Sequence, residues 1–395
     1  MKPKVLLHGD YIDENGTIVH QGYLLIENGK LEYVGGVNPL KEDEKAEISE
    51  MPSGSIMIPG MIDIHIHGAS GADMMDGTEE ALSIMAKALP AEGTTSFLAT
   101  TMTENPIHIE EALTQTAFFI EKQQPGSAEI VGIHLEGPFI SPKRAGAQPK
   151  EFIEPPNIEQ FKQWNERAKN HIRLVTLAPE MDGGLELASY LSTNGIIASI
   201  GHSDSTFEEV KEGIQYGISH VTHLFNGMRG MHHRDPGVAG AALIQSELNV
   251  EMIVDGVHAS PEMTKLAYHS TESDRTILIT DSMRAKGLGE GTYTLGGQQV
   301  TVKNGRANLE DGTLAGSILS MNDAVKNMMK FTNCSIADIV KMTSVNAAKE
   351  LKIYDKKGSL SKGKDADITV LTEDYDVFMT FCIGELAYRR KEEKV

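Results

Sequence analysis

The sequence predicts a (β/α)8 barrel that carries a small β-domain, a β-sandwich, built from both ends of the chain. Two observations support this fold. From residue 60 onward, eight short apolar runs alternate with amphipathic, helix-like segments, whereas the flanks alternate polar and apolar residues as antiparallel strands do. Strands that alternate with helices pair in parallel through right-handed crossovers, and eight such units close into a barrel. An open, doubly wound sheet is the structural alternative.

The eight predicted barrel strands follow one another between residues 61 and 281. They are MIDIHIH (61–67), TSFLATT (95–101), IVGIHLE (130–136), IRLVTLA (172–178), IIASIGH (196–202), HVTHLF (220–225), VEMIVDG (250–256) and TILITD (276–281). Three of the helices between them have predicted N-terminal caps: Thr78, Ser205 with Glu208 in capping-box spacing, and Ser260 before Pro261.

The flanking segments define the second domain. Asn28-Gly29 is typical of a hairpin turn, and the tail contains further alternating runs around two helical segments at about 320–332 and 335–351. We therefore expect the barrel to span residues 59–289. Residues 1–58 and 290–395 would form the β-domain, with the C-terminal helices packed on the barrel.

Composition narrows the possible functions and locations. The 395 residues carry a formal net charge of −20, which disfavours non-specific binding to nucleic acid or to an anionic membrane. An anionic substrate would need a local cationic pocket. No run has the length of a membrane span, and Met1-Lys-Pro-Lys leads into a strand-like segment rather than a signal peptide, so we expect a cytoplasmic protein. Cys334 and Cys382 fit no ligand spacing and are expected to be inert core residues.

Residues of the metal-ligand type fall at the ends of the predicted strands. In a strand, side chains two residues apart point to the same side, so His65 and His67 can converge on one point. Barrel enzymes carry their functional residues at this end of the strands. Each such residue alone could be a helix cap, a buried ion pair or a turn former, but together they predict a metal site for Zn²⁺, Fe²⁺, Mn²⁺ or Co²⁺. The set is His65, His67, Glu136, His202, His223 and Asp281.

Longer motifs give a family resemblance. PGMIDIHIHG, followed by HLEGPF, GHSD, HLFNGM, DGVH and TDSM, resembles the amidohydrolase superfamily and, within it, the family of N-acetylglucosamine-6-phosphate deacetylases. The resemblance covers essentially the whole chain, including the closing KGSLSKGKDADITVL. It implies metal-dependent deacetylation of N-acetyl-D-glucosamine 6-phosphate to D-glucosamine 6-phosphate and acetate, in amino-sugar catabolism or cell-wall recycling.

The resemblance also implies roles for the strand-end residues. Glu136, His202 and His223 would hold the principal metal, while His65 and His67 would hold a second one, with Glu136 as the bridge. Other members of the superfamily bridge their metals with a carboxylated lysine on the fourth strand, but IRLVTLAPE offers no lysine there.

Asp281 would be the proton carrier of the reaction. It would take a proton from the attacking water and later deliver it to the departing amine, which otherwise leaves as a poor anion. A role as a metal ligand is compatible with this one.

One position departs from the family pattern. Many relatives carry Gly-x-His after HLEGPF, with an imidazole that polarises the acetyl carbonyl, but this chain has Arg144-Ala-Gly-Ala-Gln148-Pro. Gln148 can donate through its amide, although it cannot be cationic. A second metal could replace the missing imidazole as Lewis acid, so the role stays open.

The segment Met228-Arg-Gly-Met-His-His-Arg-Asp235 supplies a cationic cluster. By resemblance, Arg234 meets the sugar phosphate, often from the neighbouring subunit of a dimer, and a planar guanidinium suits a phosphate bidentately. We therefore expect a homodimer or a dimer-based tetramer. The resemblance places further residues near the substrate: Ala147, Gln148, Asn226, Gly227, His258, Leu314, Ala315 and Gly316.

Two other functions remain open at this point. Another amidohydrolase, such as a D-aminoacylase, a dihydroorotase-like enzyme or a deaminase, would use the same strand ends but would not need the cluster around Arg234. A non-catalytic relative would keep the barrel, but such relatives usually lose metal ligands, and none is missing here.

Overall fold

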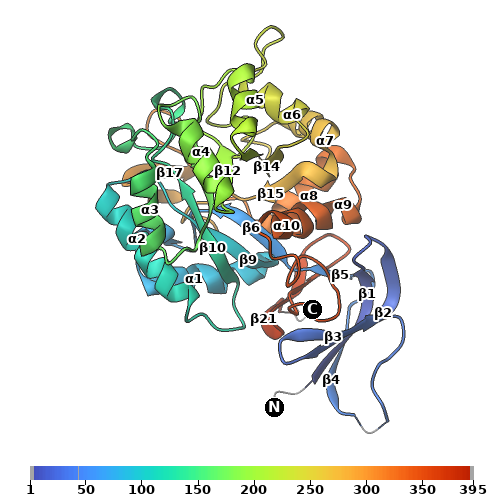
Figure 1. The fold of residues 1–395 in the computed structure, drawn as a ribbon. Helices are drawn as coiled ribbons and strands as arrows, with labels where there is room; N and C mark the ends of the chain where they lie inside the picture. Colours follow the sequence, from blue (N-terminus) through green and yellow to red (C-terminus); the bar gives the residue numbers. More distant parts are fainter. Residues whose placement is uncertain (1–3, 43, 392–395) are drawn as a thin grey trace.

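The computed structural model describes residues 4–42 and 44–391, and Figure 1 shows a barrel with a smaller domain on one side. The barrel sheet has eight strands in the order β15-β14-β13-β12-β11-β10-β9-β6, all paired in parallel. Each of the eight predicted strands is confirmed. Their bounds are β6 Met61–Ile66, β9 Thr94–Thr100, β10 Glu129–Glu136, β11 Ile172–Leu177, β12 Ile197–Ile200, β13 Ile218–Val221, β14 Asn249–Ile253 and β15 Thr276–Ile279.

The first and last strands of this sheet meet at their carboxyl ends. A parallel bridge joins Ile66 to Ser282, and the backbone N–H of Asp281 donates to the His65 carbonyl at 2.8 Å. The backbone N–H of His67 donates to the Ser282 carbonyl at 3.0 Å. These contacts close the barrel and exclude the open sheet, and they place the end of β15 beside the two histidines of the first strand.

Helices surround the barrel sheet (Figure 1). One follows each strand: α1 Glu79–Ala88, α2 Pro106–Ile120, α3 Ile158–Arg167, α4 Gly184–Thr193, α5 Phe207–Gln215, α6 Gly237–Ile244, α7 Pro261–Arg275 and α8 Met321–Thr332. The predicted caps at Thr78 and Ser260 are confirmed, since each side chain accepts a backbone N–H of its helix.

The predicted capping box at Ser205 and Glu208 is wrong by one residue. Thr206 is the N-cap of α5, and Glu209 completes the box. The reason is tertiary: the Ser205 hydroxyl donates instead to Glu180 Oε2 at 2.8 Å, in the loop after β11.

The C-terminal helices pack on the barrel. After α8 come α9 Ile336–Val340, a π-helical turn over Lys341–Val345 and α10 Asn346–Glu350. The Asn346 amide donates to the carbonyls of Ser273 and Thr276 at 2.7 and 2.8 Å. Apolar side chains of these helices belong to the main core of the barrel.

Strands from both ends of the chain build a separate sheet, as expected. Its order is β21-β20-β19-β5-β1-β2-β3, with β4 also paired to β1. Asn28 and Gly29 form the predicted hairpin turn with φ of 52° and 79°, the conformation that Asn-Gly turns favour. Cys334 and Cys382 are buried and free. The strand bounds are β1 Lys4–Ile12, β2 Ile18–Glu27, β3 Lys30–Gly35, β4 Ala46–Glu50, β5 Ile56–Pro59, β19 Ile368–Leu371, β20 Val377–Cys382 and β21 Glu385–Arg389.

One part of the tail does not join this sheet. We expected the stretch from residue 290 onward to belong to the terminal domain, but its first three strands form a sheet of their own. The buried face of that sheet, with Leu295 and Val300, packs with Met102 and Met283 from the loops at the barrel mouth. The domain boundaries at 58/59 and 289/290 stay a prediction. The strands are β16 Gly291–Leu295, β17 Gln298–Lys303 and β18 Arg306–Asn308; a short pair, β7 Gly68–Ala69 and β8 Ala72–Asp73, lies after the first barrel strand.

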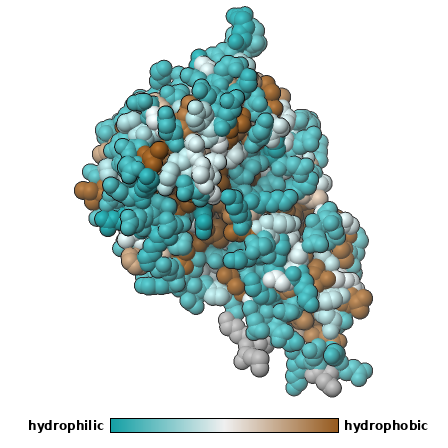
Figure 2. Space-filling model, viewed as in Figure 1, coloured by the Kyte–Doolittle hydropathy of each residue, from teal (hydrophilic) through white to brown (hydrophobic). Residues whose placement is uncertain are grey.

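Hydrophilic residues cover most of the face in Figure 2. Across residues 4–42 and 44–391, no helix combines the length and the apolar character needed to cross a membrane. The N-terminal Met1-Lys-Pro, used above in the signal-peptide argument, lies outside the described residues.

Candidate active site and metal centre

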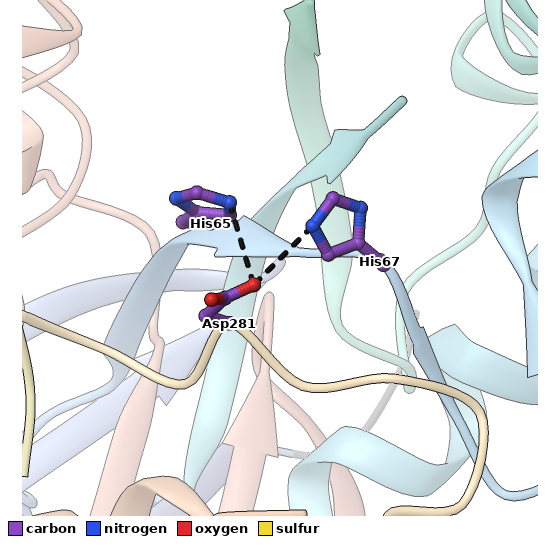
Figure 3. Close-up of side chains that lie close together, drawn as sticks. All are labelled: His65, His67 and Asp281. Atoms are coloured by element: carbon purple, nitrogen blue, oxygen red, sulfur yellow. Dashed lines mark ion pairs between the residues drawn. The ribbon is translucent and has the colours of Figure 1, made fainter. Parts of the chain in front are cut away.

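The two histidines of the first strand converge on one carboxylate. His65 lies in β6 and His67 follows its end, and Figure 3 shows both imidazoles directed toward Asp281 from the loop after β15. Asp281 Oδ1 lies 3.2 Å from His67 Nε2 and 3.6 Å from His65 Nε2. These three buried side chains are spaced so that they could hold a metal ion.

A second group of ligand-type residues lies against the first. Glu136 Oε1 is 3.3 Å from His202 Nε2 and 3.2 Å from His223 Nε2, and the two nitrogens are 3.2 Å apart. Glu136 also reaches the first group, because its Oε2 lies 3.3 Å from His67 Nε2 and its Oε1 lies 3.5 Å from His65 Nε2. The structure therefore brings all six predicted strand-end side chains into one cluster, with Glu136 shared between the two groups.

Three members of this cluster have an unusual backbone. His202, His223 and Asp281 each lie two residues beyond the end of a strand, with φ of 47°, 30° and 47°. The predicted strands ran through these residues and were too long. Left-handed conformations are disfavoured for residues other than glycine, and they persist where the surrounding contacts enforce them, commonly at functional sites.

Hydrogen bonds set the direction of the lone pairs. His202 Nδ1–H donates to the Arg144 carbonyl at 2.8 Å, and His65 Nδ1–H donates to Glu251 Oε2 at 2.9 Å. In both rings Nε2 is left as the nitrogen that can coordinate, which is the arrangement of metal-binding histidines. His65 Nε2 is buried and has no hydrogen-bond partner among the described residues. Nitrogen and oxygen donors without a thiolate fit a divalent cation here.

The pKa shifts within the cluster also support a site for a divalent cation. Burial alone would raise the pKa of Glu136, but the imidazoles, His65 foremost, hold that pKa well below its usual range. Burial alone would lower the pKa of His67, but Asp281 and Glu136 raise it to about 10. The carboxylates thus draw positive charge into a buried site, and a divalent cation would supply that charge without protonating the ligands.

A cavity of ≈ 210 Å³ opens beside the cluster. Several of the predicted substrate-binding residues line it: Ala147, Gln148, Asn226, Gly227, His258, Leu314 and Gly316. Two predicted residues do not. Ala315 is buried, and Arg234 lies on the exposed segment between β13 and α6, with its guanidinium Nη1 2.8 Å from His233 Nε2. Arg234 does not reach the cavity of its own chain.

Gln148 does not present a free donor to the cavity. Its Nε2 donates to Glu136 Oε2 at 2.8 Å, and its Oε1 accepts the backbone N–H of Thr103 at 2.8 Å. The amide therefore holds the shared carboxylate in place in this structure.

His258 is held by a carboxylate of its own loop. Its Nδ1–H donates to Asp255 Oδ2 at 2.6 Å, and Asp255 Oδ1 accepts the backbone N–H groups of His258 and Val257. Burial alone would lower the pKa of His258, but Asp255 outweighs it and raises that pKa. A protonated His258 would add positive charge to the cavity wall.

Sequence reasoning missed some residues of the site. Leu295 lines the cavity from the β16–β18 sheet, which the sequence pattern predicts as part of the terminal β-domain. Glu251, whose carboxylate accepts a hydrogen bond from His65, lies fully buried in β14, and a carboxylate between the apolar residues of VEMIV (250–254) was a signal that could have found it.

Comparison with known proteins settles the family. The profile of the amidohydrolase family matches residues 56–387, which is most of the chain. The chain belongs to the amidohydrolase family. A curated member, the N-acetylglucosamine-6-phosphate deacetylase of Bacillus subtilis (strain 168), is 48% identical over 394 residues, 99% of each chain. The enzyme of the same name from Lysinibacillus sphaericus is 45% identical over 85% of this chain and 86% of its own. The chain therefore belongs to the N-acetylglucosamine-6-phosphate deacetylase branch of the amidohydrolase family, as the motifs indicated.

Solved structures agree with this assignment. The N-acetylglucosamine-6-phosphate deacetylase of Thermotoga maritima superposes with a TM-score of 0.87 at 37% identity, covering 98% of this chain and 100% of that one. A mutant of the Mycobacterium smegmatis enzyme, in complex with N-acetyl-D-glucosamine-6-phosphate, gives a TM-score of 0.90 at 28% identity, with coverage of 98% and 100%. The amidohydrolase family is metal-dependent, and this chain holds the histidine and carboxylate groups suited to metal ions.

Proposed function

We propose that this amidohydrolase removes the acetyl group of N-acetyl-D-glucosamine 6-phosphate and releases D-glucosamine 6-phosphate and acetate. The observation that carries the proposal is the buried cluster of histidines and carboxylates beside the cavity, in a chain 48% identical to an N-acetylglucosamine-6-phosphate deacetylase. Because the substrate is a sugar phosphate, we place the reaction in the cytoplasm, in amino-sugar catabolism or cell-wall recycling.

The cluster has room for two ions in this proposal. Glu136, His202 and His223 would hold the principal ion, and His65 and His67 would hold a second one, with Glu136 available to both. A divalent cation bound there would supply Lewis acidity, which lowers the pKa of a bound water and polarises a carbonyl group. Zn²⁺, Fe²⁺, Mn²⁺ and Co²⁺ all suit these donors.

Asp281 moves the proton. Burial alone would raise its pKa, but His65 and His67 lower it, so Asp281 is ionised near neutral pH and can accept a proton. The Asp281 carboxylate takes a proton from the attacking water and passes it to the sugar nitrogen as the C–N bond breaks. The residue lines the cavity, so water and substrate can reach its carboxylate.

Binding of the sugar phosphate requires a cationic side chain, and we propose that a second subunit supplies it. Among the described residues that line the cavity there is no lysine or arginine. Asn226 and Gly227 lie at the cavity wall and would contact the phosphate, and His258 would contact the sugar. We propose a homodimer, or a tetramer built from two such dimers, in which Arg234 of the exposed segment between β13 and α6 reaches the site of the neighbouring chain.

The relatives also bear on which sugar epimer, glucosamine or galactosamine, is the substrate. An N-acetylgalactosamine-6-phosphate deacetylase of Escherichia coli O157:H7 is 33% identical over 94% of this chain, below the 48% of the Bacillus subtilis enzyme. The higher identity favours the glucosamine substrate.

Acetate release tests the proposal. We expect rapid release from N-acetyl-D-glucosamine 6-phosphate, slow release from the unphosphorylated sugar and from the galactosamine epimer, and loss of activity with a chelator that added metal restores. Equal rates with and without the phosphate would favour another amidohydrolase. No hydrolysis of any of these amides by the metal-loaded protein would favour a non-catalytic relative.

A further inference from the structure

A buried carboxylate outside the ligand cluster contacts both of its groups. Glu251 lies in β14, is 0% exposed and is aimed into the barrel interior near the cluster. A buried charge is costly unless it is paired and hydrogen-bonded, so its contacts show what it is for. Its Oε2 accepts His65 Nδ1–H at 2.9 Å and the backbone N–H of His223 at 3.1 Å, and its Oε1 accepts His220 Nε2–H at 3.2 Å.

The contact with His65 decides how that ring can bind a cation. With Nδ1 occupied by Glu251, the lone pair of Nε2 faces Glu136 and Asp281, at 3.5 and 3.6 Å. His67 and His223 have no partner on Nδ1 within the described ranges, and His202 has a neutral carbonyl. His65 is thus the ring of the cluster whose orientation depends on a carboxylate.

Glu251 holds the backbone turn at His223 through two separate hydrogen bonds, one from its side chain and one from its backbone. Besides its side chain, the Glu251 backbone carbonyl accepts the N–H of Leu224 at 2.9 Å. Any residue at position 251 would keep that backbone bond, so the strained turn at His223 is less dependent on the carboxylate than His65 is. Loss of the carboxylate should therefore affect the two groups of ligands unequally.

The same carboxylate could instead be a metal ligand itself, since His65, His134 and Glu251 are close enough to hold an ion. Its hydrogen bonds argue against that. Both Glu251 oxygens already accept N–H donors, and His134 Nε2 is 2.7 Å from the Thr176 hydroxyl. This group is a hydrogen-bonded network rather than a third cation site.

We propose that Glu251 is a positioning residue that orients His65 and thereby sets the affinity of the second ion, the one held by His65 and His67. This proposal rests on the two-ion site proposed above. It adds Glu251 as the residue on which binding of the second ion depends. Partners that orient metal-binding histidines commonly change metal affinity by about 10–100-fold when removed.

The test is a titration of metal-free protein with Co²⁺, followed by visible absorption and elemental analysis. For Glu251→Gln we expect the second ion to bind about 10–100-fold more weakly, while the first ion binds within about threefold of wild type. Glu251→Asp keeps the charge but shortens the side chain, and it should weaken the second ion as well. Equal weakening of both ions would show a general structural role and overturn the proposal, as would unchanged binding of both.

A matched control replaces another buried carboxylate by its amide. Glu92 is buried and pairs with Lys286 Nζ at 2.8 Å, away from the ligand cluster, so Glu92→Gln should bind both ions as wild type does. If wild type itself bound a single ion, the inference about Glu251 would fail while the deacetylase proposal stood. If wild type bound two ions but released no acetate, the proposed function would fail and the titration would still decide the role of Glu251.

Discussion

Replacing Asp281 by asparagine isolates the proton-transfer step. The amide has the size of the carboxylate, and asparagine tolerates the left-handed backbone that this position adopts, with φ of 47°. The principal group, Glu136 with His202 and His223, does not contain Asp281, so the first ion should stay bound. What the variant loses is an oxygen able to accept a proton.

The expected magnitude follows from this role. General acid–base groups contribute about 10²–10⁴-fold to rate, and Asp281 serves both the attack and the departure of the amine, so turnover should fall by about that factor. This corresponds to about 3–5 kcal/mol in the activation free energy. The KM should change little, because Asp281 acts on the reacting atoms.

The assay combines initial rates of acetate release with elemental analysis and thermal unfolding. Asp13→Asn, the same chemical change in an exposed turn of the terminal domain, should leave all three unchanged; the Asp13 carboxylate only accepts two backbone N–H groups of its own turn. Asp281→Asn protein that kept its metal and more than about a tenth of wild-type turnover would refute the proton-carrier role.

Four further predictions concern the ion stoichiometry, Arg234, the subunit arrangement and His258. Wild type should bind up to two ions per chain, and His67→Ala should bind one; elemental analysis showing two ions in His67→Ala would contradict this ligand assignment. Arg234→Ala should raise the KM for the phosphorylated sugar by about 10–100-fold, because it removes a charge-assisted contact worth about 1.5–3 kcal/mol. The KM for the unphosphorylated sugar should not change. Arg234→Lys should restore the KM only in part, because an ammonium cannot bind the phosphate bidentately. Mixed Arg234→Ala and Asp281→Asn chains should regain activity in heterodimers, and no recovery in proven heterodimers would place Arg234 in its own chain's site. Because Asp255 raises the pKa of His258 from 6.5, their pair stabilises the fold fully below about pH 6.5 and loses that contribution as pH rises through the raised value. The unfolding free-energy gap between wild type and His258→Gln should therefore shrink at alkaline pH, and a gap independent of pH would contradict the pairing.

The barrel and most of its site could be predicted because they follow from local periodicity. Buried parallel strands read as continuous apolar runs, and all eight were found in order along the chain. A strand's two-residue period placed His65 and His67 on one side, and the fold rule that strand ends share a rim placed Glu136 beside them. Local signals of this kind need no knowledge of distant residues.

The sequence predictions failed where one local residue pattern is compatible with two different structures. The alternation in β16–β18 shows that one face is buried, but it does not say against what, and the sheet packs on the barrel mouth rather than on the terminal domain. The strands that end before His202 and His223 stop because the chain turns into a left-handed conformation, which the apolar run does not reveal.

The sequence by itself determined the fold class, the ligand types and the family. Only the tertiary structure decided which atoms meet: that Gln148 faces Glu136, that Arg234 lies outside its own cavity, and that Glu251 reaches His65 across 186 residues of chain. The physical reason is that a hydrogen bond requires donor and acceptor within about 3 Å, and for residues far apart in sequence that distance is set only when the barrel closes.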